Sequence, residues 1–496
     1  MTFDAVLTEP VHRQACKHLL RHVRGGHRQE EVCFALWRPG TGADRQSAIV
    51  FDLVLPAAGD RHLHGNASFE PGYLTRAVRL ACARGAGLAF MHNHLSAGWQ
   101  DMSKPDVVAE RDRIAAPARA SGLPLVGLTL ATDGAWSARF WTWDGTRFRR
   151  SWCTKVRVVG RRLLVTCNDA LLPPPGRRAA LRRTIDTWGE ARQQDIARLR
   201  VGIIGVGSVG CMVAETLARM GIENLVLVDP DRVETHNLDR LLYASEADAG
   251  EYKVDLAVRN LERGATAERF HVETHARPIQ HEAAYRAVLD CDVLFSAVDR
   301  PLPKDLLNRI AYAHCIPVIS GGVHIDNKPS GELANALWSV TVIGPERRCL
   351  RCAGQYTTSD VVMERDGSLD DPAYVRRHGD TRTPTNQNVF PFSANLASLM
   401  VIEMVRLTVA AAWWPDSGGK LSYSMIPGRL RSVDERCEEA CSVSEGTALG
   451  DRYRYPFLVD AEPEGSPTGV AAAAMEIVKR MVRAGRRLLR VSAWGR

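Results

Sequence analysis

The chain has 496 residues, which is too long for one hydrophobic core and favours two domains or more. Hydrophobic residues make up 45% of it and charged residues 24%, the proportions of an ordinary globular protein. The net charge of +7 is modest for this length and does not indicate nucleic acid as a partner. No signal peptide is visible near the N-terminus, because acids and a proline stand where an apolar core would lie.

The N-terminal third alternates short apolar segments with helical patterns. Residues 9–24 predict a helix that ends at Gly25 and Gly26, a common stop signal. After it we expect strands at 32–36 and 48–55, a helix at 73–86, and strands at 87–91, 125–131 and 138–143. These elements predict a first α/β domain over residues 1–150.

A second α/β region follows a break at Pro173–Gly176. We expect residues 151–195 to be a linker with an arginine-bearing helix, the helix running over about 179–199. Strands are expected at 201–204, 225–228, 293–297 and 317–320, alternating with helices. That alternation is typical of a doubly wound, Rossmann-like parallel sheet, here over residues 196–445.

Two later segments bear on membranes and partners. The most apolar window, residues 396–414, contains Glu403 and Arg406, so we predict a buried amphipathic helix and no membrane span. Residues 446–496 are expected to be a weakly organised tail with a basic end. A docking helix for an acidic partner, contact with a membrane surface and a solvated tail all remain open for it.

Two histidines follow the predicted strand at 87–91. Residues two apart in a strand point to the same face, so His92 and His94 can converge on one point. Asp106, at the start of a predicted helix, could reach back to them, and two imidazoles with a carboxylate are ligands of catalytic zinc. Ser103 could donate a hydrogen bond to an oxyanion, and Glu31, just before an apolar run, is the candidate general base.

These residues resemble the motif of JAB/JAMM (MPN) zinc isopeptidases, which cut ubiquitin-like proteins from lysines or trim their C-terminal extensions. The likeness covers about residues 10–145. It implies that His92, His94 and Asp106 bind zinc, that Glu31 is the acid/base, and that Ser103 is the oxyanion donor. Eight residues separate His94 from Ser103, where the family usually has seven, so we expect a wider loop there.

Simpler explanations exist for parts of this set. Ser103 and Asp106 also fit a helix capping box, and Glu31 alone would be a solvated charge. A second His-x-His pattern, at His62 and His64, lies among Gly, Asn and Asp without a matching Ser-x-x-Asp, and we interpret it as loop. The complete set around His92 favours metal binding.

A glycine motif follows the predicted strand at 201–204. Gly205, Gly207 and Gly210 would let the backbone approach a phosphate, while the next helix supplies N–H donors. Asp229, at the end of the following strand, is placed to bind a ribose hydroxyl. Alone, this motif would indicate a dinucleotide.

The residues that follow favour a triphosphate instead. Polar and ionic side chains gather after two strands, namely Asp231, Asn237, Arg240, Lys253 and Asp299. A hydride-transfer enzyme needs an apolar slot for nicotinamide. Arginine and lysine neutralise phosphates, and aspartate can hold magnesium, so the set predicts ATP and Mg²⁺.

The ordered set is similar to the ThiF/MoeB-type adenylyltransferases, the superfamily that includes ubiquitin-activating enzymes, over about residues 180–445. Those enzymes adenylate the C-terminal glycine of a ubiquitin-like or sulfur-carrier protein. The resemblance implies that Gly205, Gly207 and Gly210 line the phosphate loop, Asp229 holds the ribose, Asn237, Arg240 and Lys253 bind phosphates, and Asp299 positions magnesium and the carboxylate. It also implies that Arg183 reaches into the partner subunit's site, hence a homodimer. Leu241 stands where a glutamine is common.

Twelve cysteines suit a reducing cytoplasm, where close pairs more often bind metal than form disulfides. Cys349 with Cys352, and Cys437 with Cys441, form two such pairs and predict a structural zinc site of four thiolates; four ordinary thiols are the alternative. No cysteine lies between the two pairs, where related activating enzymes often carry a thioester-forming cysteine. The acyl-adenylate would then pass directly to a partner's thiol.

Together the two halves predict one protein that activates a ubiquitin-like modifier and also processes or deconjugates it, with a conjugating enzyme as a further partner. Such fusions resemble components of bacterial ubiquitin-like conjugation operons, some linked to phage defence. Two alternatives stay open. One is sulfur-carrier activation in cysteine, thiamine or molybdopterin-type metabolism, and the other is a non-catalytic nucleotide-binding scaffold.

Overall fold

The computed structural model describes residues 1–370, 388–409 and 419–459. Within these ranges the chain forms a nine-stranded sheet, an eight-stranded sheet and a short hairpin. Residues Met1–Phe457 make up one compact unit. The protein is therefore of the mixed α/β class, as predicted.

The first sheet is built from the N-terminal third of the chain. Its spatial order is β11 (Leu163–Cys167), β10 (Lys155–Val159), β1 (Thr2–Thr8), β3 (Arg45–Val54), β2 (Val32–Thr41), β6 (Gly87–Asn93), β7 (Leu125–Leu130), β8 (Trp136–Trp143) and β9 (Phe148–Trp152). Its helices are α1 (Glu9–Leu19), α2 (Arg21–Arg24), α3 (Pro71–Ala83), α4 (Lys104–Val108) and α5 (Ala115–Ala118). Helix α1 and the six predicted strands and helices after it are all present.

Strand β6 lies inside this sheet, between β2 and β7, and is buried along its whole length. Ala89 and Met91 pack in the cluster that contains α1, while Leu88 and Phe90 pack on the opposite face in the cluster that contains α3. Alternate side chains point to opposite faces, so a continuous apolar run indicates that both faces are covered. The strand ends in the histidine pair and delivers it to the edge of a rigid sheet.

Two segments that were predicted to be irregular are strands. The first sheet continues past the predicted boundary at residue 150, because β10 pairs in parallel with β1 and β11 adds an antiparallel edge. His62 and His64 lie in β4 (Arg61–His64), which pairs with β5 (Asn66–Phe69) instead of forming a loop. Their local composition did not show this, because both pairings depend on residues outside the segment.

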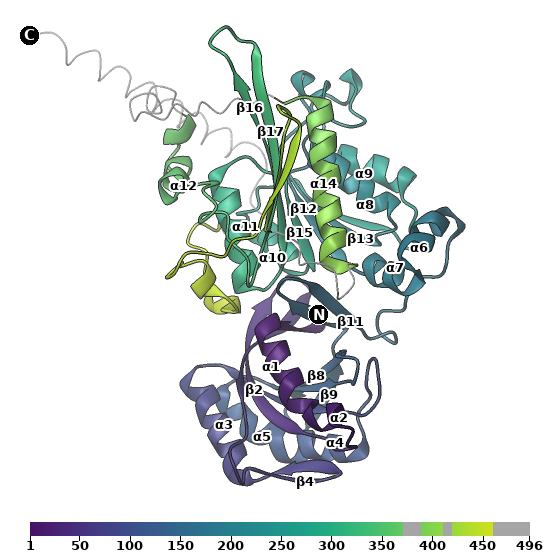
Figure 1. The fold of residues 1–496 in the computed structure, drawn as a ribbon, viewed down its shortest axis with the longest axis vertical. Helices are drawn as coiled ribbons and strands as arrows, with labels where there is room; N and C mark the ends of the chain where they lie inside the picture. The colour runs from purple at the N-terminus through teal and green to yellow at the C-terminus, as the bar shows by residue number, and fades with distance from the viewer. Residues whose placement is uncertain (371–387, 410–418, 460–496) are drawn as a thin grey trace, which may run out of the picture. The chain divides into compact units, whose positions relative to one another are not determined.

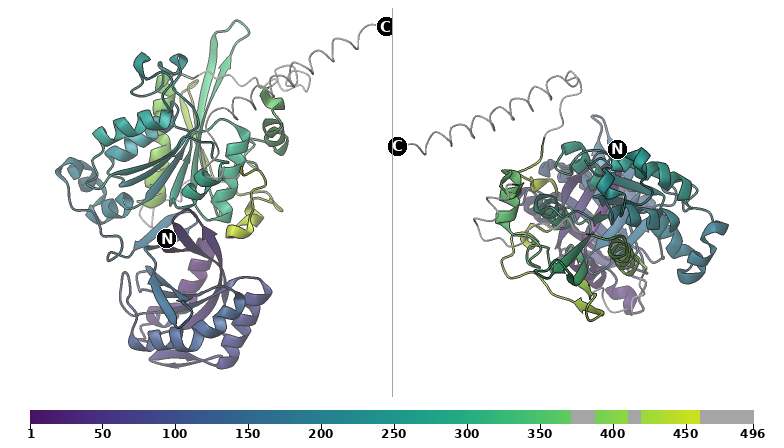
Figure 2. Two further views of the ribbon diagram at one scale, coloured as in Figure 1. Left: turned by 180° about the vertical axis from the view of Figure 1, so that it is seen from behind. Right: turned by 90° about the horizontal axis from the view of Figure 1, so that it is seen from above.

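The second sheet has a parallel half and an antiparallel half. In spatial order it contains β14 (His271–His275), β13 (Asn224–Val228), β12 (Arg200–Ile204), β15 (Val293–Ser296), β16 (Val318–Asn327), β17 (Leu333–Ile343), β18 (Lys420–Ser424) and β19 (Arg429–Val433). The strands from β14 to β16 pair in parallel, and those from β16 to β19 pair antiparallel. The Rossmann-like prediction is confirmed for the parallel half, and the β16–β17 hairpin extends beyond the helices in two views (Figures 1 and 2).

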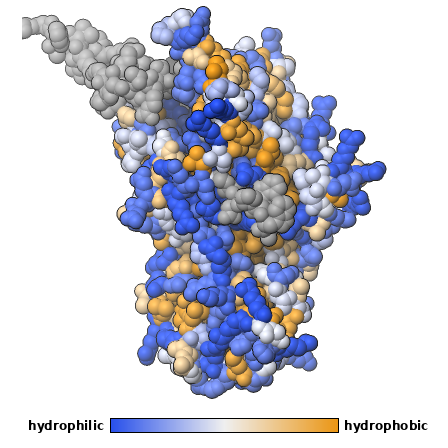
Figure 3. Space-filling view, viewed as in Figure 1, coloured by the Kyte–Doolittle hydropathy of each residue, from blue (hydrophilic) through white to orange (hydrophobic). Residues whose placement is uncertain are grey.

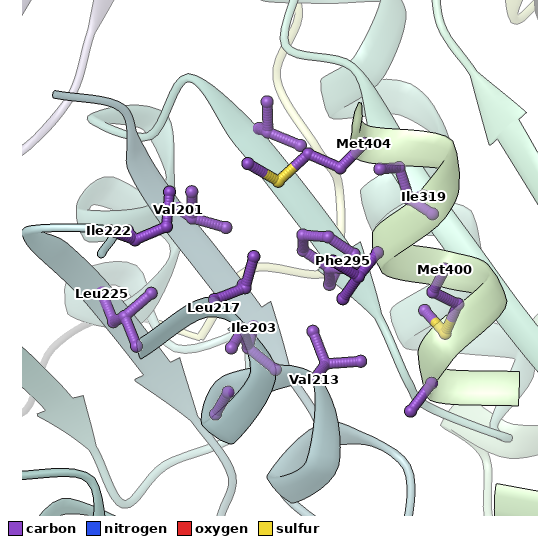
Figure 4. Packing of buried hydrophobic residues seen from close by; sticks show 14 of the residues in the cluster. Val201, Ile203, Val213, Leu217, Ile222, Leu225, Phe295, Ile319, Met400 and Met404 are labelled. Carbon is purple, nitrogen blue, oxygen red and sulfur yellow. The ribbon is translucent and has the colours of Figure 1, made fainter. Parts of the chain in front are cut away.

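Helices cover this sheet. They are α6 (Arg182–Trp188), α7 (Glu190–Ala197), α8 (Gly210–Arg219), α9 (Lys253–Gly264), α10 (Glu282–Leu289), α11 (Pro301–Ala313), α12 (Thr358–Arg365) and α14 (Phe390–Thr408). Helix α14 lies against α8, β16 and β17 (Figure 1). Figure 4 shows Met400 and Met404 of α14 turned toward Phe295 of β15 and Val213 of α8, and these side chains form one buried cluster.

Helix α14 is the one helix among the described residues that is long and apolar enough to cross a membrane. Its Met400 and Met404 are fully buried in the protein, and its buried Glu403 pairs with Arg406 at 2.6 Å. Ile402, by contrast, is 47% exposed. On the face shown in Figure 3 apolar and polar residues alternate, with an apolar area over the part that holds α14 and β17.

Two predicted segments differ in the structure. The expected helix over 179–199 is split into α6 and α7 at Gly189, whose φ of 88° no helical residue adopts. Residues 446–459 were expected to begin a weakly organised tail, but they make specific contacts with the rest of the protein. Asp451 accepts hydrogen bonds from the N–H and hydroxyl of Thr41 at 2.9 and 2.6 Å, and the buried Tyr455 donates to Asp305 at 3.2 Å. Residues 460–496, with the basic segment, lie outside the described residues.

A buried ion cluster joins the two sheets. Asp292, at the start of β15, is fully buried and accepts from Arg45 of β3 at 2.8 Å and from Lys155 of β10 at 2.6 Å. The Arg45 guanidinium also pairs with Asp4 of β1 at 3.1 Å. The neighbouring cations lower the pKa of Asp292 although burial opposes them. Asp292 of the second sheet therefore depends on cations from the first sheet.

We predict that Arg45→Met lowers the free energy of unfolding by about 3–5 kcal/mol, because it leaves two buried carboxylates short of a cation. The matched control is Arg84→Met, since the Arg84–Asp52 pair leaves its side chains 47% and 40% exposed and should contribute about 1 kcal/mol or less. Denaturant unfolding of both variants measures the difference. Equal losses would contradict the role given to the cluster.

Candidate functional sites

A glycine loop joins β12 to α8. Gly205 has a φ of +87°, and a Cβ there would lie 2.7 Å from the carbonyl oxygen of Ala297. A Cβ on Gly210 would lie 1.8 Å from the carbonyl oxygen of Gly205, so any side chain would push helix and loop apart. Gly207 faces open space. The arrangement leaves the N-terminus of α8 bare, which is where a phosphate group binds best.

Asp229 follows β13, as predicted, and holds the glycine loop. Its carboxylate accepts the N–H of Val206 at 2.6 Å and the N–H of Asp231 at 2.8 Å. Burial raises its pKa, and the nearby Lys253 opposes that shift. The side chain therefore connects the loop to the segment that carries the basic residues.

The predicted phosphate-binding residues follow Asp229 in the chain, and their polar groups already have partners. Lys253 donates to Asp231 at 2.8 Å, Arg240 donates to the carbonyl of His236 at 2.7 Å, and Asn237 accepts the N–H of Glu234 at 3.1 Å. Lys253 also lines a small, partly open cavity together with Val206 of the loop. The structure brings these predicted residues to one side of the sheet.

Cys211 lines the same cavity behind Gly210. A helix N-terminus ordinarily lowers a thiol pKa, but burial raises that of Cys211 to about 11. The cysteine is therefore a packing residue and not a nucleophile at neutral pH.

Asp299 lies between β15 and α11, exposed at the carboxyl edge of the parallel strands. Lys304, in the first turn of α11, interacts electrostatically with Asp299 and Glu364, while burial lowers its pKa. The neighbouring Arg300 forms two hydrogen bonds to Asp370 at 2.8 and 3.0 Å. The sequence analysis did not identify Lys304, although its place one helical turn after Asp299 is the signal that could have found it.

Arg183 is exposed on α6. Among the described residues its guanidinium forms no ion pair, whereas Arg182 beside it approaches Asp186 at 3.8 Å. Among the described residues no contact joins the Arg183 side chain to Asp299 or to the glycine loop.

The four predicted cysteine ligands converge. The sulfur atoms of Cys349, Cys352, Cys437 and Cys441 all lie within 4.8 Å of one another. Cys441 Sγ lies 3.7 Å from Cys349 Sγ and 3.4 Å from Cys352 Sγ. Tetrahedral zinc at about 2.3 Å from each sulfur requires separations of about 3.8 Å. The cluster fits a structural zinc ion without a large rearrangement.

The histidine and aspartate ligands converge as well. His92 Nε2 lies 3.2 Å from His94 Nε2 and 3.5 Å from Asp106 Oδ1, and His94 Nε2 lies 3.2 Å from Asp106 Oδ2. Tetrahedral zinc with nitrogen and oxygen ligands requires separations of about 3.3 Å. His92 is buried, whereas His94 and Asp106 are half-buried, so the cluster opens to solvent on one side. That is the geometry of a metal site that retains a water.

Ser103 is the N-cap of α4. Its Oγ accepts the N–H of Asp106 at 3.3 Å, and Asp106 Oδ2 accepts the N–H of Ser103 at 2.7 Å. This is the capping box that the sequence also allowed. The cap fixes Asp106 beside His94, and the Ser103 hydroxyl proton is not used by it.

The structure corrects the assignment of Glu31. The Glu31 carboxylate is fully buried and faces Arg21 and Arg61, with His18 at 3.7 Å. Val32 pairs with His92 in the sheet, so Glu31 belongs to the opposite face.

Glu30 is the glutamate that lies near the metal-binding cluster. Burial raises its pKa, and electrostatic interactions with His92 and His94 oppose this while Asp106 adds to it. Glu30 therefore replaces Glu31 as the candidate general base. The apolar run after these residues covers both sheet faces, so it could not show which glutamate points to the histidines.

A parallel sheet that ends in a glycine loop at a helix N-terminus, with an aspartate closing the next strand, defines a nucleotide-binding α/β fold. The ThiF family model matches residues 181–441, more than half of the chain. The chain belongs to the ThiF family.

Curated relatives match the same region. The SAMP-activating enzyme E1 of Haloferax volcanii is 29% identical over 168 residues, which are 34% of this chain and 58% of that protein. The mouse adenylyltransferase and sulfurtransferase MOCS3 is 32% identical over 158 residues, 30% of this chain and 34% of its own length. The chain thus spans less than two thirds of either relative. A structure of E. coli MccB with ATP has a TM-score of 0.41 and 19% identity, covering 54% of this chain and 76% of that one.

We predict that Cys441→Ser removes one zinc ion per chain, because a serine hydroxyl does not replace a thiolate ligand at neutral pH. Metal analysis of the purified protein by mass spectrometry measures the loss. Cys82→Ser, which changes an exposed cysteine outside the cluster, should keep the full metal content. Unchanged zinc in Cys441→Ser would contradict a four-cysteine site.

Proposed function

We propose that the C-terminal half uses ATP and magnesium to adenylate the C-terminal carboxylate of a ubiquitin-like or sulfur-carrier protein. Membership of the ThiF family carries this proposal. The names of the relatives support it, since one is an E1 for SAMP and another is an adenylyltransferase. The site contributes the glycine loop, the basic residues beside it and an exposed carboxylate at the strand edge.

The reaction follows from charge and position. The carboxylate of the carrier protein attacks the α-phosphate and pyrophosphate leaves, so no protein nucleophile is required. The glycine loop and the N-terminus of α8 hold phosphate oxygens, while Arg240 and Lys253 neutralise them, with Asn237 as a further donor. Asp229 would bind the ribose, and Asp299 would hold magnesium and orient the attacking group.

Arg183 supports a homodimeric enzyme. It is exposed and forms no ion pair among the described residues, as a residue that serves a partner subunit should be. A guanidinium inserted beside the leaving pyrophosphate would add positive charge to the site. We therefore propose that two chains complete each other's adenylation sites.

The test of adenylation is ATP–pyrophosphate exchange in the presence of a ubiquitin-like protein with a free glycine terminus. We predict that Asp299→Ala lowers the exchange rate by about a hundredfold or more, because the site loses its magnesium-binding carboxylate. Asp326→Ala removes a 52% exposed aspartate on the β16–β17 hairpin and should leave the rate unchanged. Exchange at the full rate in Asp299→Ala would rule out the assigned role.

We further propose that the N-terminal half is a zinc isopeptidase of the JAB/JAMM type that acts on the same modifier. The spacing of His92, His94 and Asp106 supports it, since their ligand atoms lie 3.2–3.5 Å apart. Zinc bound there would supply a Lewis acid and a water of lowered pKa. Glu30 accepts the proton of the attacking water, and the Ser103 hydroxyl donates to the oxyanion.

We predict that Glu30→Gln lowers hydrolysis of a modifier–lysine isopeptide by about a hundredfold or more while zinc content stays the same, because it removes only the base. The neighbouring Glu31→Gln should destabilise the fold but leave the rate per folded, zinc-loaded molecule within a few fold. Gel analysis of cleavage and metal analysis of both variants compare the two glutamates. Loss of activity in Glu31→Gln alone would restore the original assignment.

A cytoplasmic enzyme with both activities would adenylate the C-terminal glycine of a modifier and would also release the same glycine by hydrolysis. A conjugating enzyme is the expected acceptor of the activated modifier, because the described residues show no reactive cysteine near Asp299. The alternative is sulfur-carrier metabolism, which the name of the mouse adenylyltransferase and sulfurtransferase MOCS3 favours. Mass spectrometry of the carrier after incubation with ATP separates the two, since one predicts a lysine conjugate and the other a thiocarboxylate.

A further inference from the structure

A buried ionic network lies beside the His92 cluster, and neither proposed activity uses it. Arg139 of β8 and Glu110 are both fully buried. Arg139 Nε donates to Glu110 Oε2 at 2.9 Å, a second pair of their atoms is also in contact, and the Trp141 indole donates to Glu110 Oε2 at 2.7 Å. A buried ion pair is weak evidence of added stability, because desolvation offsets the attraction. Its position therefore needs another explanation.

One end of the network reaches a metal ligand. Arg139 Nη1 donates to Thr129 Oγ1 at 2.6 Å, and Thr129 Oγ1 lies 3.4 Å from His92 Nε2. Thr129 of β7 is in register with His92 of β6, so the sheet itself holds the two side chains together. Since Thr129 Oγ1 accepts from Arg139, its own proton is directed toward the space between the ligand atoms.

The other end reaches the helix that carries the third ligand. Glu110 follows Asp106 by four residues, on a helical segment that turns into a π-helix over Ala109–Ile114. Single π-turns are rare and often occur at functional sites. The Arg139–Glu110 pair thus connects the Asp106 helix to the strand beside His92.

The sheet is shaped to admit this pair. A Cβ on Gly127 of β7 would lie 2.3 Å from Glu110 Oε2 and 2.5 Å from Arg139 Nε, so only glycine leaves room. The backbone conformation at Gly127 does not itself require glycine. The ion pair therefore occupies the space that a side chain at this position would need.

His92 lacks the usual second anchor. Metal-binding histidines ordinarily donate their other ring nitrogen to an acceptor, which fixes the ring. His92 Nδ1 is buried and has no hydrogen-bond partner among the described residues. What holds the ring is stacking on Phe90, with centroids 5.5 Å apart, and the contact with Thr129.

We propose that Glu110, Arg139 and Thr129 are positioning residues that fix His92 relative to Asp106 and so set the size of the metal-binding cavity. This inference rests on the proposed metal site of the N-terminal half. Thr129 is the member that faces the ligands, and its hydroxyl orients the His92 Nε2 side of the cavity. Arg139 positions Thr129 through their hydrogen bond, and Glu110 positions Asp106 through the helical segment that they share.

The test uses Co²⁺ as a spectroscopic probe in the full chain, with zinc retained in the four-cysteine cluster. The spectrum of the His92→Ala, His94→Ala double variant serves as the background. Thr129→Val keeps the shape of the side chain and removes the hydroxyl. We expect it to weaken Co²⁺ binding about tenfold or more in chelator competition and to shift the ligand-field absorption.

Two variants provide matched comparisons. Thr129→Ser restores the hydroxyl and should recover both affinity and spectrum. Ser137→Ala removes a buried hydroxyl in register with Thr129 that has no hydrogen-bond partner among the described residues, and it should match the wild type. Glu110→Gln, which keeps the shape but loses the charge, should also weaken Co²⁺ binding and tests the network if Thr129→Val does not fold.

The outcomes separate this inference from the proposed function. If Thr129→Val and Glu110→Gln are less stable but bind Co²⁺ with wild-type affinity and spectrum, the network is structural and the inference is overturned while the metal site stands. If the wild type binds no more Co²⁺ than the double-histidine variant, both the inference and the proposed peptidase are overturned.

Discussion

The protein depends on the burial of one carboxylate, Asp292, at the start of β15. Two of its partners, Arg45 and Lys155, come from the other sheet, so the buried charge of Asp292 depends on both sheets. Without these partners Asp292 would be an uncompensated buried charge, and with them it fixes the base of the strand that ends before Asp299. The two sheets lie in one compact unit over Met1–Phe457, and these ion pairs cross between them.

Most elements could be predicted because their patterns are local. The strand–glycine–helix unit at residues 200–219 and the alternation of His92 with His94 follow from periodicity alone. Glu30 and Glu31 could not be distinguished, because the run after them is apolar on both faces. Only the pairing of Val32 with His92 decides which glutamate points to the ligands. The prediction of a linker where the structure has β10 and β11 was wrong for a similar reason. The strand that pairs with β10, β1, is about 150 residues away in the chain.

The candidate ligands were predictable, but what holds them was not. By sequence, Asp106 and Ser103 fitted either a metal motif or a capping box, and the structure shows a capping box that also places Asp106 beside His94. The cap fixes the carboxylate at 3.2 Å from His94. By contrast, the path from Glu110 through Arg139 to Thr129 crosses three separate elements, and no local pattern connects them. The sequence reflects this path only in Gly127, and a single glycine within a strand has several explanations.

The two candidate metal clusters and the nucleotide loop differ in how their polar groups are satisfied. In the candidate clusters the side-chain donor atoms already lie near the separations that zinc requires, held by caps, register and stacking, so metal binding would need little reorganisation. In the loop Lys253 pairs with Asp231, and Arg240 and Asn237 bond to their own segment. A triphosphate must exchange these contacts for its own, and the exposed partner Asp231 loses little when Lys253 turns away. The first arrangement favours tight retention of an ion, and the second favours a substrate that must arrive and leave.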